Sequence, residues 1–131
     1  MRFLGIDHGD VRIGLALSDE TGLVARPFQI IKHTSRAGDA ETIVNIAAAQ
    51  NVSRIIVGLP TGDDGQTGHQ GRKVQRWAEA LAEATSIPIE FWDESLSSVE
   101  AGGLRSKRKG KRHLPLDAEA AALILQSYLD A

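Results

Sequence analysis

The sequence predicts an α/β fold: a five-stranded mixed sheet in which an antiparallel meander is followed by parallel strands, with helices on both faces. Two apolar segments, residues 2–7 and 11–18, are separated only by a short turn at residues 8–10. Such a connection favours an antiparallel pair of strands. Two later apolar segments, 54–60 and 87–92, each follow a stretch with helical spacing. That order is typical of parallel strands joined by helical crossovers.

A third strand is expected at residues 24–31, directly after the antiparallel pair. This segment contains Pro27, which has no backbone N–H group to donate to a neighbouring strand. We therefore expect residues 24–31 at an edge of the sheet. Residues 54–60 are instead mostly apolar and β-branched, as expected for a buried parallel strand.

Apolar residues at helical spacing indicate two helices between these strands. The first helix is expected to end near Asn51, and the second is expected to include residues 74–81. The positions that indicate them are Ala40, Ile43, Val44, Ile46 and Ala47 for the first helix, and Val74, Trp77, Ala78 and Leu81 for the second.

Two further helices are expected after the fifth strand. Ser97 and Glu100 have the spacing of a capping box, which predicts a short helix reaching about Ser106. Pro115 favours the start of the last helix, which is expected to continue to about Asp130. The resulting order of elements, βββαβαβαα, is that of the ribonuclease H-like fold.

Length and composition predict one soluble domain. A chain of 131 residues has the size of a single domain, here residues 1–131, and can bury a sizeable core. It contains no cysteine, which excludes disulfides and thiolate metal sites. The N-terminus reaches a charged residue too early for a signal peptide, and no apolar run approaches about eighteen residues. We therefore expect a soluble cytoplasmic protein with no membrane segment.

The charged residues are unevenly distributed along the chain. There are 15 Lys and Arg against 17 Asp and Glu, a formal net charge of −2. Residues 105–113, RSKRKGKRH, contain no acid and carry six cations: Arg105, Lys107, Arg108, Lys109, Lys111 and Arg112. We expect these six to contact the backbone phosphates of a nucleic acid without reading its sequence. A solvated surface loop is the alternative interpretation.

Acidic residues are expected to meet at one edge of the sheet. Asp7 ends the first predicted strand, Asp93 and Glu94 end the fifth, and Asp117 lies in the first turn of the last helix. Ligands of open α/β sheets collect outside the carboxyl ends of the strands. If the last helix crosses that edge, Asp117 approaches Asp7. The pattern does not decide between Asp93 and Glu94.

A carboxylate cluster of this kind favours a hard cation. Two unit charges 4 Å apart cost about 4 kcal/mol at an effective dielectric constant of 20, and Mg²⁺ relieves this repulsion with carboxylate and water oxygens. Two such ions activate a water and stabilise the leaving oxygen of a phosphodiester. Small side chains at Ala120 and Ala121 would let the helix that carries Asp117 approach the sheet. Taken singly, each acid is also typical of turns or of helix N-termini.

Four segments together resemble the YqgF (RuvX) family, whose members are described as pre-16S rRNA nucleases and as Holliday-junction-resolvase-like proteins. The segments occur in the family's order and span almost the whole chain. They are GIDHGDVRIGLALSD, IIVGLPTGDDGQTG, FWDESLSSVEA and LDAEAAALILQSYL. The resemblance implies a ribonuclease H-like fold and a role in maturing the 5′ end of small-subunit ribosomal RNA.

The resemblance also implies roles for individual residues. Asp7, Glu94 and Asp117 match the family's three acidic positions, so we expect them to be catalytic and to bind the metal. The resemblance thus favours Glu94 over its acidic neighbour. Arg12 matches a characteristic basic residue and is expected to contact the nucleic acid. Ser95 stands where the family usually has an arginine, which removes a fixed cation beside the expected site.

Together, the residues and the resemblance predict a nuclease that uses one or two Mg²⁺ or Mn²⁺ ions to cleave structured RNA. Its expected substrate is precursor 16S rRNA, free or within a pre-ribosomal particle, in ribosome biogenesis. A Holliday junction resolvase acting on branched DNA is one alternative, and a nucleic-acid-binding module without turnover is another. The sequence shows no Ser-His-Asp or Cys-His set that would supply a protein nucleophile. It leaves both a monomer and a homodimer open.

Overall fold

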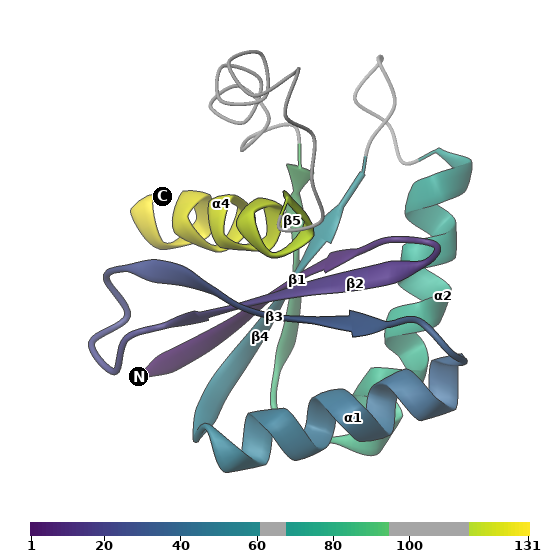
Figure 1. Ribbon diagram of the computed structural model, residues 1–131, viewed down its shortest axis with the longest axis horizontal. Helices are drawn as coiled ribbons and strands as arrows, with labels where there is room; N and C mark the ends of the chain where they lie inside the picture. Colours follow the sequence, from purple (N-terminus) through teal and green to yellow (C-terminus); the bar gives the residue numbers. More distant parts are fainter. Residues whose placement is uncertain (61–67, 95–115) are drawn as a thin grey trace.

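A computed structural model describes residues 1–60, 68–94 and 116–131 of the chain (Figure 1). Five strands form one sheet in the order β3-β2-β1-β4-β5. The pairs β1–β2 and β2–β3 are antiparallel, and the pairs β1–β4 and β4–β5 are parallel, so the predicted mixed sheet is confirmed. The strands are β1 (Arg2–His8), β2 (Arg12–Ser18), β3 (Ala25–Lys32), β4 (Val52–Leu59) and β5 (Ile89–Asp93).

Helices cover both faces of the sheet. Figure 1 shows α4 (Leu116–Asp130) lying across one face, with α1 (Arg36–Ala49) and α2 (His69–Ala84) on the other side. The helix expected at residues 97–106 falls outside the described residues. Within the ranges that are described, no helix is long and apolar enough to cross a membrane.

The expected edge strand is confirmed at β3. Pro27 pairs with Ala16 of β2, and the β2–β3 register shifts between Leu15 and Ala16. A proline is tolerated at this position, because β3 is an edge strand and its pairing with β2 is irregular here.

Two apolar clusters fill the space on either side of the sheet. The larger one joins the sheet to α1 and α2 and includes Leu4, Ile6, Ile13, Ile43 and Leu81, each fully buried. The smaller one joins the sheet to α4. Because alternate residues of a strand point to opposite faces, the two clusters assign every strand residue to the α1–α2 face or to the α4 face.

The helix α4 lies almost directly on the backbone of three neighbouring strands, at glycines. A Cβ atom added at Gly5 of β1 would lie 2.8 Å from Leu125 Cβ, and one at Gly58 of β4 would lie 2.5 Å from Ile124 Cδ1. At Gly14 of β2, it would lie 1.9 Å from the carbonyl oxygen of Asp117. No side chain fits at Gly14 unless the start of α4 moves.

A buried carboxylate ties α1 to α2 on the other face. Asp39 is 1% exposed and accepts hydrogen bonds from Trp77 Nε1 at 2.9 Å, from the Thr34 backbone N–H at 3.0 Å and from His33 Nδ1. Burial favours the neutral acid, but the hydrogen bonds from Thr34, Trp77 and His33 outweigh it and hold the pKa of Asp39 below its ordinary value. The ionised carboxylate therefore stabilises this face.

The substitution Gly14→Ala is expected to displace the start of α4 and to lower the free energy of unfolding by about 3 kcal/mol, because overpacked sites strain the backbone. Urea denaturation measures the change. The control is Gly68→Ala, since a Cβ there meets nothing within 4 Å among the described atoms. If both variants were equally stable, α4 would not be seated on Gly14 as described.

The substitution Asp39→Asn is expected to lower the free energy of unfolding by about 2 kcal/mol near neutral pH, because buried donors lose a charged acceptor. Asp39 has a lower pKa in the folded state than its ordinary 3.8, so its ionised form stabilises the fold above that range. Protonation removes this stability as the pH falls through the folded-state pKa.

Urea titrations from about pH 7 down to about pH 3 should therefore show the difference between wild type and Asp39→Asn narrowing in acid. The exposed Glu83 of α2 provides the control Glu83→Gln, which is expected to change stability by less than about 0.5 kcal/mol. A difference that stayed constant or widened in acid would contradict the role given to Asp39.

Candidate functional site

The carboxyl ends of β1, β4 and β5 lie at the same edge of the sheet, because these three strands are parallel. Asp7 is the penultimate residue of β1, and Glu94 directly follows β5. The start of α4, with Asp117, packs over the neighbouring strand β2. All three predicted acids therefore belong to elements that meet at this edge.

Asp7 lies on the α4 face of the sheet. Gly5, two residues earlier in β1, faces Leu125 of α4, and side chains two residues apart share a face. In the β1–β2 ladder, Asp7 is the direct partner of Gly14. Its side chain is half-buried, as expected beside a helix terminus.

Asp117 is placed over that same point. Its carbonyl group packs against Gly14, the ladder partner of Asp7. The small residues expected to allow this approach, Ala120 and Ala121, are buried, at 8% and 0% exposed, and Ala121 belongs to the apolar cluster between α4 and the sheet. The expectation that the last helix crosses the edge near Asp7 is confirmed by this contact.

Glu94 shares the α4 face, whereas strand alternation places Asp93 on the opposite one. A Cβ atom at Gly58 would lie 3.2 Å from Glu94 Cγ, so the Glu94 side chain lies above β4. Gly58 follows Val57, the partner of Ile6 in β1, and is therefore alongside Asp7. The geometry thus separates two acids that the sequence left as alternatives.

Arg12 carries positive charge into this group. Its Nε donates a hydrogen bond to Asp117 Oδ2 at 2.9 Å, and the two side chains are 44% and 31% exposed. At this exposure an ion pair contributes little stability. Its significance is positional, since it keeps a guanidinium group, which can donate to phosphate oxygens, next to the acids.

The three acids have the chemistry that a hard divalent cation requires, although their side chains do not converge on one point. Carboxylate oxygens are the ligands that Mg²⁺ and Mn²⁺ prefer. In the ranges 1–60, 68–94 and 116–131, however, no three His, Asp or Glu side chains converge as a ready metal site. The assignment of Asp7, Glu94 and Asp117 as metal ligands stays a prediction.

Other predicted contact residues lie outside the described ranges. These are the six cations Arg105, Lys107, Arg108, Lys109, Lys111 and Arg112, and Ser95, which stands where the family usually has an arginine, also lies outside those ranges. His8, next to Asp7 in the sequence, is described and lies on the opposite face. Its ring packs 4.7 Å from Trp77 and 5.4 Å from His33, measured between ring centroids.

Sequence reasoning missed Lys32, the last residue of β3. Lys32 is the direct ladder partner of Arg12. Two cations therefore lie side by side at the edge of the sheet where Arg12 binds Asp117. The available signal was a cation at the end of a predicted strand, which has no meaning until the register between strands is known.

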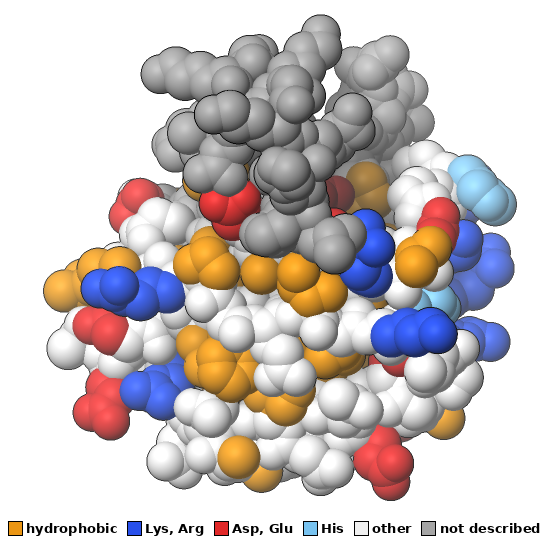
Figure 2. All heavy atoms as spheres, viewed as in Figure 1, with side chains coloured by type: hydrophobic (Ala, Val, Ile, Leu, Met, Phe, Trp, Pro, Cys, Tyr) orange, Lys and Arg blue, Asp and Glu red, His pale blue; other side chains and the backbone are white. Residues whose placement is uncertain are grey.

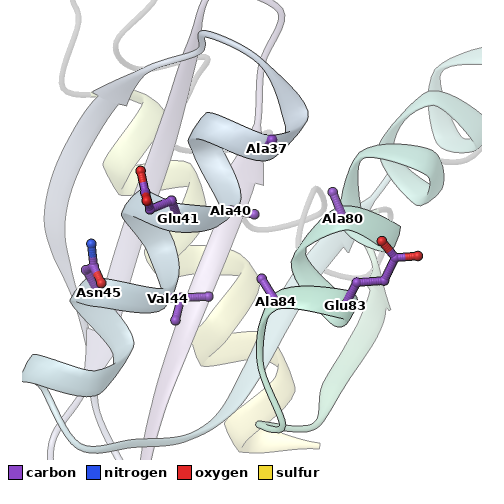
Figure 3. A pocket seen from close by; sticks show the side chains of 8 residues that line it. All are labelled: Ala37, Ala40, Glu41, Val44, Asn45, Ala80, Glu83 and Ala84. Carbon is purple, nitrogen blue, oxygen red and sulfur yellow. The ribbon is translucent and has the colours of Figure 1, made fainter.

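A shallow groove of about 450 Å³ lies elsewhere, between α1 and α2 (Figure 3). Its floor is formed largely by the alanines Ala37, Ala40, Ala80 and Ala84, and Glu41 and Glu83 project from its two sides. The groove lies on the α1–α2 side of the sheet, whereas the three acids belong to the α4 side. The groove is therefore not part of the site formed by the three acids.

Comparisons with known proteins identify the family of the chain. A family model described as "RuvX: Holliday junction resolvase" matches residues 1–131. A relative from Thermoanaerobacter pseudethanolicus, named "Putative pre-16S rRNA nuclease", is 45% identical over 135 residues, covering 100% of this chain and 97% of the relative. One of the same name from Anaeromyxobacter sp. is 44% identical and covers 99% and 97%.

Solved structures of resolvases have the same fold. RuvC of T. thermophilus in complex with a Holliday junction substrate aligns with a TM-score of 0.64 at 16% identity, over 98% of this chain and 93% of that one. The fowlpox virus Holliday junction resolvase aligns with a TM-score of 0.56 at 12% identity, over 99% of both chains. These likenesses confirm the ribonuclease H-like fold. The full-length family match and the close relatives go further: the chain belongs to the RuvX family, a family of nucleases that act on phosphodiester bonds.

Proposed function

We propose that this chain is a divalent-metal-dependent nuclease that cleaves structured RNA, and that it matures the 5′ end of precursor 16S rRNA in the cytoplasm. The observation that carries the proposal is the meeting of Asp7, Glu94 and the start of α4 at one edge and on one face of the sheet. The names of the close relatives favour precursor rRNA as the substrate.

Asp7, Glu94 and Asp117 would hold Mg²⁺ or Mn²⁺. Asp7 is the central acid, because its strand β1 lies between β2, which Asp117 packs over, and β4, which Glu94 packs over. The metal would supply Lewis-acid stabilisation of the charge that develops on the phosphate. Arg12 would bind a phosphate oxygen of the substrate, exchanging its present partner Asp117 for that oxygen. The rigid β1 backbone keeps Asp7 in place during the reaction.

Cleavage of branched DNA is the second candidate, favoured by the description of the family as Holliday junction resolvases. It uses the same acids and differs in substrate. Resolution of a four-way junction cuts two strands, so this candidate requires a homodimer that presents two sites, whereas a monomer suffices for trimming RNA. Binding without turnover is a third alternative, and it requires no contribution from Asp7.

The substitution Asp7→Asn is expected to lower cleavage by about a hundredfold to a thousandfold, because removing one group that stabilises charge at a reacting centre costs that much in rate. The assay uses a labelled RNA that spans the precursor–mature 5′ junction of 16S rRNA, with Mn²⁺ or Mg²⁺ and with a chelator. Asp10→Asn is the matched control, since Asp10 is an exposed acid in the following turn that pairs with Lys73.

A four-way DNA junction and a scrambled RNA are assayed in parallel. Cutting of the precursor RNA that needs metal and Asp7, and that Asp10→Asn retains, is the expected result. Preferential cutting of the junction by a dimer would replace RNA by DNA as the substrate. Equal RNA binding by wild type and Asp7→Asn with no cleavage by either would contradict the nuclease.

Metal binding is expected to change thermal stability in a way that depends on Asp7. Removing one of several close carboxylates relieves repulsion, so Asp7→Asn should melt at a higher temperature than wild type in chelator. Adding millimolar Mn²⁺ should then raise the melting temperature of wild type by mass action and leave the variant unchanged. Equal metal responses in both proteins would contradict Asp7 as a ligand.

A further inference from the structure

The cations outside residues 105–113 gather at one corner of the molecule. Nine Lys and Arg lie outside that segment, and five of them belong to the end of β3 and the first turns of α1 and α2. We call these five the basic corner: Lys32, Arg36, Arg72, Lys73 and Arg76. Figure 2 shows Lys and Arg side chains concentrated on the side where Figure 1 places these elements.

The basic corner is continuous with the candidate active site. Lys32 is the ladder partner of Arg12, and partners in a ladder project to the same face of the sheet. The Arg12 side chain reaches Asp117 on the α4 face, so Lys32 also projects to that face. The side chain of Lys32 is exposed, and it thus extends the positive charge of Arg12 from the acids toward the sheet edge.

Hydrogen bonds fix the elements that carry the corner. The His33 backbone N–H donates to the Val11 carbonyl at 2.9 Å, which ties the end of β3 to the β1–β2 turn. Lys73 of α2 donates to Asp10 of the same turn at 2.8 Å. Asp39 joins His33 to α2 through Trp77, beside Arg76. The corner is therefore built on rigid elements.

The positive charge of the corner is only partly balanced. Lys73 pairs with Asp10, and this interaction lowers the pKa of Asp10. Lys32, Arg36 and Arg76 are exposed and form no ion pair with another residue of the described ranges. Exposed cations without protein partners remain available to phosphates, and each phosphate contact releases counterions.

We propose that the basic corner binds the phosphate backbone of the nucleic acid that leads away from the cleavage site, past Arg12 and Lys32 toward the starts of α1 and α2. This inference rests on the proposed function and adds the path of the substrate to it. Contacts of this kind go to phosphates and fix position without reading sequence. The corner would therefore act equally on an RNA and on a DNA backbone.

The test measures binding apart from cleavage. All proteins carry Asp7→Asn and are kept in chelator, and binding to a fluorescein-labelled RNA hairpin with a single-stranded tail is followed by anisotropy. Lys32→Gln is compared with Arg26→Gln, which removes one exposed cation near the opposite end of the same strand. The double variant Lys32→Gln/Arg36→Gln and the charge-preserving Lys32→Arg complete the set.

We expect Lys32→Gln/Arg36→Gln to weaken binding on the order of tenfold at low salt, and to reduce the slope of log affinity against log salt by about 1 to 2 between about 50 and 200 mM KCl. Lys32→Gln should show part of this loss, whereas Lys32→Arg and Arg26→Gln should bind like the parent. A hairpin of different sequence and a four-way DNA junction should show the same losses.

The proposal is overturned if the double variant binds like Arg26→Gln, or if the parent protein binds neither probe at about 50 mM KCl. Loss of binding confined to one sequence would also overturn it, because backbone contacts do not read bases. The cleavage assay with Asp7 intact is independent of these outcomes. If the protein cleaves RNA but the substitutions at Lys32 and Arg36 do not change binding, the proposed function stands and this inference is wrong. If the substitutions weaken binding but the protein does not cleave RNA, only this inference stands.

Discussion

The backbone contact between α4 and three glycines of the sheet is the constraint on which the candidate site depends. Gly5, Gly14 and Gly58 lie on adjacent strands and present no side chain to the helix. Because α4 approaches so closely, its first turn reaches the carboxyl edge directly over the ladder partner of Asp7. A longer residue at Gly14 would lift the start of α4 and separate Asp117 from Asp7, even if every acid remained in the sequence.

Strand alternation places neighbouring residues of each strand on two faces of the sheet that differ in their surroundings. On the α4 face, Asp7 and Glu94 are half-buried, Asp7 beside its ladder partner Gly14 and Glu94 above Gly58. On the α1–α2 face, His8 packs against Trp77, and Asp39 is buried within a hydrogen-bonded network. Asp7 and His8, which are neighbours in the sequence, therefore lie on opposite faces, the first beside the start of α4 and the second against Trp77. Asp39 of α1 binds His33 and, in α2, Trp77. The His33 backbone N–H in turn donates to Val11 in the β1–β2 turn, so these contacts hold the turn close to both helices.

Much of the fold follows from the sequence because its signals are local. The short turn after His8 determines the first pairing, and Pro27 identifies the edge strand. One boundary, the start of helix α1, is not visible as periodicity. Helix α1 begins at Arg36, before its apolar repeat, because the Ser35 side chain accepts a hydrogen bond from the Gly38 N–H and caps it.

The site was less predictable, because it depends on contacts between distant segments. The sequence could identify Asp7 and Asp117 as candidates from their places in single elements. It could not separate Asp93 from Glu94, which requires the alternation of β5 relative to α4, nor pair Lys32 with Arg12, which requires the β2–β3 register. The resemblance to a known family selected Glu94, and the geometry gives a physical reason for that choice. The basic corner has no local signal, since its residues come from three elements.

The central claim is that Asp7, Glu94 and Asp117 form one metal site beneath the start of α4. Anomalous diffraction from crystals soaked in Mn²⁺ tests this claim most directly, because it locates the ion without relying on turnover. We expect an anomalous peak within coordinating distance of the carboxylates of Asp7 and Glu94, with Asp117 turned from Arg12 toward the ion. Mn²⁺ bound elsewhere, or no peak at these carboxylates while Asp117 stays paired with Arg12, would contradict it.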